Sequence, residues 1–85
     1  MKENYSSGKI SITAAATEID PSFDMSLISC YSESEFLFRV RNQNAWGSWV
    51  SVPEKIPFED TIPGQKIEVK SLSGTITLYY FIRGE

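Results

Sequence analysis

The chain contains no histidine among its 85 residues. Ser-His-Asp triads, Cys-His dyads and most zinc sites need an imidazole, so the sequence excludes these kinds of site. The five glycines stand singly, and they form no Gly-rich loop of the kind that cradles phosphate. We therefore predict a protein that is not an enzyme and that uses no metal or cofactor.

Cysteine occurs once, as Cys30, so no disulfide can form within the chain. Cys30 lies in the apolar stretch from Leu27 to Tyr31, where a thiol is predicted to be a small buried hydrophobe and not a reactive group. A single unpaired cysteine also suits a protein that folds in a reducing cytosol.

Long apolar runs and basic blocks are missing as well. The most apolar stretch, Ile76 to Ile82, is too short to span a bilayer, and no apolar run follows the N-terminal residues. The eight Lys and Arg residues are scattered singly in a chain of net charge −3. We therefore expect no signal peptide, no membrane anchor and no nucleic-acid partner.

The composition is that of a globular domain, with 41% hydrophobic and 22% charged residues. A chain of 85 residues forms one domain. The polar start predicts a flexible N-terminal arm over residues 1–8, followed by a single domain over residues 9–85. Aromatic residues, at 13%, supply much of the burial that such a small domain needs.

The segment from Glu35 to Val52 is predicted to be the central hairpin of the fold. Asn42, Gln43 and Asn44 supply turn chemistry, because asparagine tolerates a positive φ angle. Residues 45–52 are again rich in residues that favour strands. The alternation before the turn puts three apolar residues on one face and two arginines on the other: Phe36, Phe38 and Val40 against Leu37, Arg39 and Arg41.

The rest of the chain shows alternation in short stretches broken by turn residues, and no helix of useful length is predicted. Asp20-Pro21 and Pro63-Gly64 are predicted turns, the second a type II turn with a positive φ at Gly64. Ile19 and Phe23 are expected to anchor a loop over 17–25, and 54–63 is at most an edge strand. Further strands are expected over 9–16, 26–32, 65–70 and 75–83. This pattern predicts an all-β fold, a small antiparallel β-sandwich or jelly-roll-like domain of five to seven strands.

The tryptophans and the closing strand provide the candidate contact residues. Trp46 and Trp49 could form a platform for stacking sugars, or one could lie in the core and the other at a strand end. The closing strand is apolar on both faces, so it is either central in a sheet or meets another chain. The predicted partner-contact residues are Trp46, Trp49, Arg39, Arg41, Tyr79 and Phe81.

Two acidic pairs are candidates for chemistry. Glu59 and Asp60 are adjacent on an extended segment, so their side chains point to opposite faces and should not converge on a substrate. Asp20 and Asp24 could hold Ca²⁺ together with Glu33 or Glu35, although their spacing does not match an EF-hand loop.

Two family resemblances follow from these motifs. FRVRNQNAWGSWVSVPE, residues 38–54, resembles the F–G hairpin of fibronectin type III domains, but residues 55–85 have no counterpart after that hairpin. The layout from Gly8 onward, with FRVR, WGSWVSV and KIEVKSLSGTITLYYFIRG, resembles small all-β virion proteins of tailed bacteriophages. The second resemblance implies a head-decoration, head-fibre or tail-adaptor subunit, and it identifies no functional residues.

These observations predict a non-enzymatic virion structural subunit, made in the host cytoplasm, that binds other virion proteins or copies of itself in a symmetric assembly. The alternatives are a carbohydrate- or cell-surface-binding β-sandwich module that uses Trp46 and Trp49, and a fibronectin type III-like module.

Overall fold

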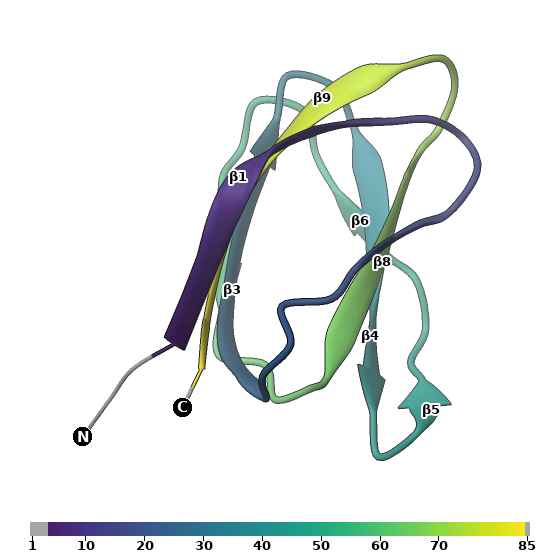
Figure 1. The fold of residues 1–85 in the computed structure, drawn as a ribbon. Coiled ribbons are helices and arrows are strands. Elements are labelled where there is room, and N and C mark those ends of the chain that lie inside the picture. Colours follow the sequence, from purple (N-terminus) through teal and green to yellow (C-terminus); the bar gives the residue numbers. More distant parts are fainter. Residues whose placement is uncertain (1–3, 85) are drawn as a thin grey trace.

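The computed structural model describes residues 4–84, and within this range the chain is all-β, with two antiparallel sheets facing each other (Figure 1). No helix in this range could cross a membrane. The strands are β1 (Asn4–Ile12), β2 (Thr17–Ile19), β3 (Met25–Ser32), β4 (Phe36–Asn42), β5 (Ala45–Trp46), β6 (Val50–Val52), β7 (Phe58–Asp60), β8 (Lys66–Ser71) and β9 (Ile76–Gly84). The predicted β-sandwich is confirmed.

The first sheet has the strand order β1-β9-β3-β7, and the second has the order β2-β8-β4-β5 with β6 also paired to β4. The closing strand β9 is therefore central in its sheet, between β1 and β3. The N-terminal part of the chain supplies an edge strand to each sheet, first β1 and then β2.

The core lies between the two sheets and is formed by residues that alternate along the strands. Phe36 and Phe38 are its largest fully buried side chains, and the Phe38 ring meets that of Phe58 at a centroid distance of 4.9 Å. Two buried polar side chains, Ser32 and Ser71, donate hydrogen bonds to backbone carbonyl oxygens. The buried apolar residues are Ile12, Ile19, Met25, Ile28, Cys30, Phe36, Phe38, Val52, Ile67, Val69, Leu78 and Ile82.

Residues 4–84 form nine strands where five to seven were expected. The predicted strand over 45–52 is interrupted and forms β5 and β6, and part of the predicted loop over 17–25 forms β2. The predicted anchors of that loop are confirmed, since Ile19 is buried and Phe23 packs against the core. The three alanines at 14–16 lie outside strands, so the first strand ends at Ile12 and not at Ala16.

The prediction of a flexible arm over residues 1–8 is wrong for Asn4 to Gly8. These residues form the first half of β1, which pairs without interruption with β9 from Asn4↔Gly84 to Ile12↔Ile76. This polar segment has no alternation, and it forms a strand because β9 is nine residues long and pairs with β1 along its whole length. Residues 1–3 of the predicted arm lie outside the described residues.

The turns fit the predictions in part. Gln43 and Asn44 adopt φ angles of 53° and 64°, which is the geometry of a tight type I′ hairpin turn. Gly64 differs from the prediction, because its φ is not positive and it forms an isolated bridge with Met25. A Cβ at Gly64 would overlap Val40 Cγ1 and lie 3.0 Å from the carbonyl oxygen of Arg41. Glycine is required at this position by the close approach of neighbouring segments.

Candidate functional site

The six predicted contact residues lie on two separate outer faces of the sandwich. Arg39, Arg41, Trp46 and Trp49 gather on the outer face of the β2-β8-β4-β5 sheet, because their neighbours Phe36 and Phe38 on β4 point into the core. Tyr79 and Phe81 lie on the outer face of the other sheet. The structure thus does not bring the six residues together into one site.

A β-bulge brings the two tryptophans onto one face. Arg41 pairs with Trp46 and Phe38 pairs with Val50, so three steps along β4 correspond to four steps along the returning chain. In a regular strand, residues three apart point to opposite faces, and the extra residue of a bulge removes this offset. Both tryptophans are half-buried on this outer face, so the alternative in which one of them lies in the core is wrong.

The guanidinium of Arg39 lies against both tryptophans, 4.8 Å from the ring centroid of Trp46 and 4.7 Å from that of Trp49. The ammonium of Lys70 lies 4.2 Å from the Trp49 centroid, and the guanidinium of Arg41 lies 5.9 Å from that of Trp46. These distances are typical of cation–π contacts. We call Arg39, Arg41, Trp46, Trp49 and Lys70 the cation–π stack.

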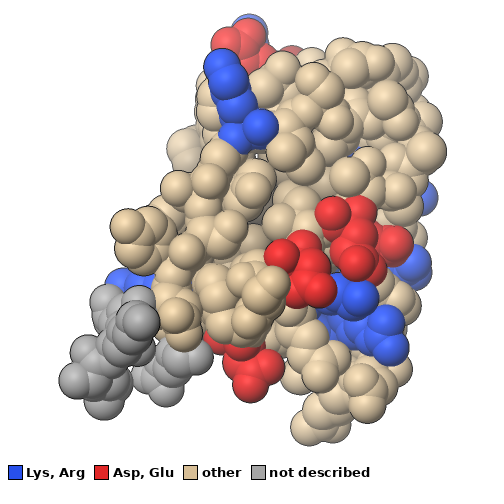
Figure 2. Space-filling view, in the orientation of Figure 1, with Lys and Arg blue, Asp and Glu red and all other residues tan. Residues whose placement is uncertain are grey.

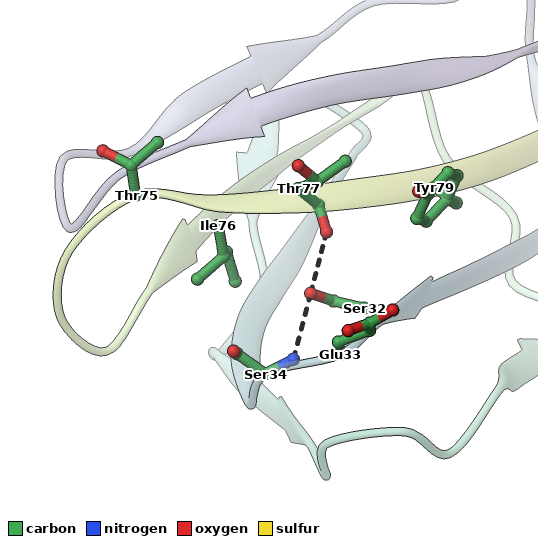
Figure 3. Close-up of a pocket in the computed structure, with 7 residues that line it drawn as sticks. All are labelled: Ser32, Glu33, Ser34, Thr75, Ile76, Thr77 and Tyr79. Carbon is green, nitrogen blue, oxygen red and sulfur yellow. Dashed lines mark hydrogen bonds between the residues drawn. The ribbon is translucent and has the colours of Figure 1, made fainter.

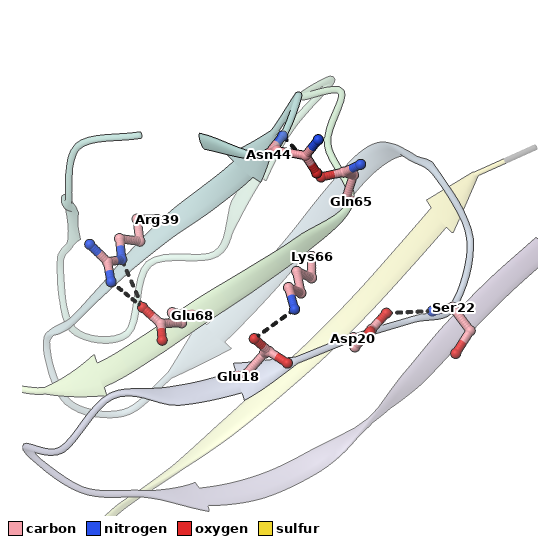
Figure 4. A network of polar contacts seen from close by, with 8 residues as sticks. All are labelled: Glu18, Asp20, Ser22, Arg39, Asn44, Gln65, Lys66 and Glu68. Carbon is pink, nitrogen blue, oxygen red and sulfur yellow. Dashed lines mark hydrogen bonds and ion pairs between the residues drawn. The ribbon is translucent and has the colours of Figure 1, made fainter. Parts of the chain in front are cut away.

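An ion pair of Arg39 holds the cation–π stack against β8, and a second ion pair lies on the same sheet (Figure 4). The Nε of Arg39 donates to Glu68 Oε1 at 2.7 Å, and a second guanidinium nitrogen contacts the same oxygen. The ammonium of Lys66 lies 3.0 Å from Glu18 Oε1 on β2. Figure 2 shows acidic and basic side chains adjoining in one cluster in the region where β8 lies in Figure 1. Within the chain, Arg39 and Lys66 are thus paired with the carboxylates of Glu68 and Glu18.

We expect Arg39→Lys to lower the free energy of unfolding by about 1–2 kcal/mol, because an ammonium cannot stack flat on two rings or bond Glu68 through two nitrogens. Trp46 and Trp49 are the chain's only tryptophans, so their fluorescence reports on the stack directly. The tryptophan emission of Arg39→Lys should shift to longer wavelength than that of wild type. Arg41→Lys should shift it less, because Arg41 lies farther from the Trp46 ring. Equal emission from wild type and Arg39→Lys would contradict the stacking role.

The outer face of the first sheet carries four aromatic rings, which we call the aromatic face: Tyr5, Tyr31, Tyr79 and Phe81. Tyr5 stacks on Phe81 with ring centroids 6.1 Å apart, and Tyr31 lies against Tyr79 at 6.3 Å. Tyr5, Tyr79 and Phe81 are 70%, 46% and 38% exposed. This face therefore leaves aromatic surface in contact with solvent.

Cys30 is a buried free thiol on β3, as predicted. Burial raises its pKa from 9.0 to about 12. The thiol faces the core, so the structure gives it a packing role in place of a reactive one.

This pKa shift predicts a loss of stability at high pH. The thiol of the unfolded chain ionises near pH 9, while that of the folded chain keeps its proton up to about pH 12. Between these values the free energy of unfolding should fall by up to about 1.4 kcal/mol per pH unit. Urea titrations of wild type and Cys30→Ala at several pH values measure this slope, and the tyrosines and lysines common to both cancel. Parallel pH profiles would contradict the assignment.

A shallow hollow of about 310 Å³ lies where β3 ends and β9 begins (Figure 3). The buried hydroxyl of Ser32 donates to the carbonyl oxygen of Thr77 at 2.8 Å and accepts from the backbone N–H of Ser34 at 3.3 Å. Because both interactions are internal, Ser32 ties β3 to β9 and is not poised as a nucleophile. The hollow is lined by Ser32, Glu33, Ser34, Thr75, Ile76, Thr77 and Tyr79.

The predicted Ca²⁺ ligands Asp20 and Asp24 line different hollows. Asp20 caps its own turn, with Oδ1 accepting from the N–H of Ser22 at 2.9 Å, and it lines a hollow together with Arg41 and Lys66. Asp24 lines a different hollow. Over residues 4–84, no group of three or more His, Cys, Asp or Glu residues is placed to hold a metal ion.

Glu59 and Asp60 lie on the edge strand β7, opposite Ser29 and Ile28 of β3. Successive residues of a strand point to opposite faces, so the two carboxylates diverge as predicted. The side chain of Asp60 accepts a hydrogen bond from the N–H of Thr61 at 2.8 Å.

Comparison of the chain with known protein families, curated proteins and solved structures finds no match. The hairpin that resembles the fibronectin F–G pair lies at a sheet edge and is followed by β7, β8 and β9. Its bulge and its edge position are the features that shape the cation–π stack.

Four residues of the two faces were not among the predicted contact residues: Tyr5, Tyr31, Glu68 and Lys70. Glu68 and Lys70 could have been found from the alternation over 65–70, which points them to the same side as each other. Tyr5 and Tyr31 join Phe81 and Tyr79 only through strand register, which the local pattern does not determine.

Proposed function

We propose that this chain is a non-enzymatic structural subunit of a virus particle, which acts by burying part of its surface against other subunits. The proposal rests on the aromatic face, where four rings lie on the outer side of one sheet. Tyrosine and phenylalanine are enriched in protein interfaces, because they bury a large area at a low cost in conformational entropy. The sequence resemblance to small virion proteins of tailed bacteriophages supports the particle as the setting.

The size of the chain suits this role. A standard contact buries about 800 Å² of each partner, which is roughly a sixth of the 5147 Å² accessible surface of this molecule. The outer face of the four-stranded sheet is the side of the molecule where such a contact would cover exposed aromatic rings. Symmetric copies would add avidity, so that each single contact need not be strong.

Sugar binding through Trp46 and Trp49 receives less support. A stacking platform needs an open ring face, and Arg39 lies over both rings while Lys70 lies over Trp49. A sugar would have to displace these cations or use the remaining ring surface. We therefore interpret the cation–π stack as an internal brace of the hairpin.

The proposal is tested on particles purified by density gradient from cells in which the chain is made naturally. We expect the chain in the particle fraction, in a fixed ratio to the main shell protein. Abundant chain in the lysate with none in the particles would overturn the proposal. Retention of the purified chain on a polysaccharide column, with loss of retention in Trp49→Ala, would favour the carbohydrate module in its place.

A further inference from the structure

The first sheet has one edge strand that lacks the usual protection against pairing. The edge strand β7 has three residues, two of them acidic, and lies between Pro57 and Pro63. At the edges of the second sheet, β2 has three residues and β5 and β6 are short and separated by a bulge. β1 has nine residues, no proline, no register shift and one charge, Lys9. Natural proteins normally blunt an edge of this length.

The backbone groups that β1 presents to solvent can be identified from the neighbouring strands. The carbonyl oxygen of Thr77 accepts a hydrogen bond from Ser32 on β3, and that of Ser32 accepts one from Lys55 on the β7 side. Odd-numbered residues of β9 therefore point their backbone groups toward β3, and even-numbered ones toward β1. Because even residues of β9 pair with even residues of β1, the odd residues of β1, Ser7 among them, face the open edge.

We propose that β1 pairs with β1 of a second copy of this chain, antiparallel about a two-fold axis that passes beside Ser7. This deepens the proposed function, on which it rests, by naming the contact through which copies associate. The two four-stranded sheets would become one continuous eight-stranded sheet. Such an isologous contact closes on itself and gives a dimer, not a filament.

The side chains of β1 are complementary to themselves in this register. Tyr5 and Lys9 are both on the outer face, and with Ser7 on the axis each Tyr5 lies opposite the partner's Lys9. Lys9 already has Tyr79 as its ladder neighbour on β9. Its ammonium would lie between Tyr79 and the partner's Tyr5, a favourable arrangement for a cation beside aromatic rings. No like charges face each other, and the aromatic faces of the two copies become continuous.

The oligomeric state of the purified full chain tests this inference by sedimentation equilibrium. We expect a species of twice the 9.6 kDa chain mass at micromolar concentration. Ser7→Pro removes an N–H that faces the open edge, so it should raise the dimer Kd by about tenfold or more. Ser7→Ala keeps that N–H and is the matched control, with a Kd within about twofold of wild type.

A second variant keeps the test decisive if Ser7→Pro does not fold. Ser7→Lys places two ammonium groups opposite each other on the axis, so the dimer should dissociate at low salt and recover in part at high salt. A monomer at every concentration, a head-to-tail polymer, or a folded Ser7→Pro that dimerises like wild type would overturn the inference. A monomer that is still found in particles would overturn the inference alone. A dimer that is absent from particles would overturn only the proposed function.

Discussion

We expect Phe38→Ala to lower the free energy of unfolding by about 3–5 kcal/mol, the usual cost of removing a buried phenylalanine. Phe38 is 1% exposed on β4, and its ring packs on that of Phe58 on the facing sheet. An 85-residue domain has a total stability of about 4–13 kcal/mol, so this change should remove a large part of it. Urea denaturation followed by circular dichroism measures the loss.

The matched control is Phe81→Ala, which removes the same atoms from an exposed site on β9. Phe81 is 38% exposed and touches Tyr5 on the outer face, so its loss should cost less than about 1.5 kcal/mol. If Phe38→Ala has no folded baseline, Phe38→Leu gives a smaller loss that can be measured. Equal costs at the two positions would contradict the placement of the core between the sheets.

Gly64→Ala should destabilise the fold by about 1–3 kcal/mol through overpacking. The added methyl group would overlap Val40 Cγ1 and press on Met25 Cε, 3.1 Å away. Gly64 also exchanges two backbone hydrogen bonds with Met25, at 2.7 and 3.3 Å, and these link the starts of β3 and β8. A shift that relieves the overlap would therefore strain this link. Thermal and urea unfolding both report the change.

Gly74 provides the contrast that separates packing from backbone conformation. Its φ is +68° and its surroundings are open, so Gly74→Ala should cost about 1–2 kcal/mol and Gly74→Asn less, since asparagine tolerates this conformation. Gly64→Asn should be at least as harmful as Gly64→Ala, because the larger side chain has no space. Recovery of stability by Gly64→Asn would show that φ and not space limits this position.

The strands of the sandwich could be predicted where alternation is strong. Phe36 and Phe38 on β4, and Ile67 and Val69 on β8, alternate with polar or partly exposed residues and are buried as expected. Alternation is a local property of the chain, since it follows from the geometry of a single strand. The hairpin turn at Gln43 and Asn44 was predictable because the tolerance of asparagine for a positive φ angle is also a local property.

What could not be predicted depends on pairing between distant segments. Asn4 to Gly8 carry no strand pattern and become ordered only because β9 lies beside them. The role of Gly64 depends on Val40 and Met25, which approach it from other parts of the chain. No turn propensity encodes such an approach, so the type II turn was the wrong interpretation of Pro63-Gly64.

In the candidate site, too, local features could be predicted from the sequence, and contacts between distant segments could not. Trp46, Trp49 and Arg39 were recognised from their chemistry. Their contact with one another depends on a β-bulge, which cannot be predicted from the β-rich residues over 45–52. Tyr79 and Phe81 were recognised from a strand that is apolar on both faces. Their aromatic neighbours across the sheet were missed because register across strands is a tertiary property.

The aromatic face can be tested by measuring the amount of chain in virus particles assembled with variants in place of the native chain. We predict that the double change of Tyr79→Ser and Phe81→Ser lowers this amount by about tenfold or more while the chain stays folded. The matched control changes Ile56 and Leu72 to serine, because both are 54% exposed and lie outside the aromatic face, and it should leave the amount unchanged. Equal incorporation of the two double variants would contradict the claim that the aromatic face makes the contact.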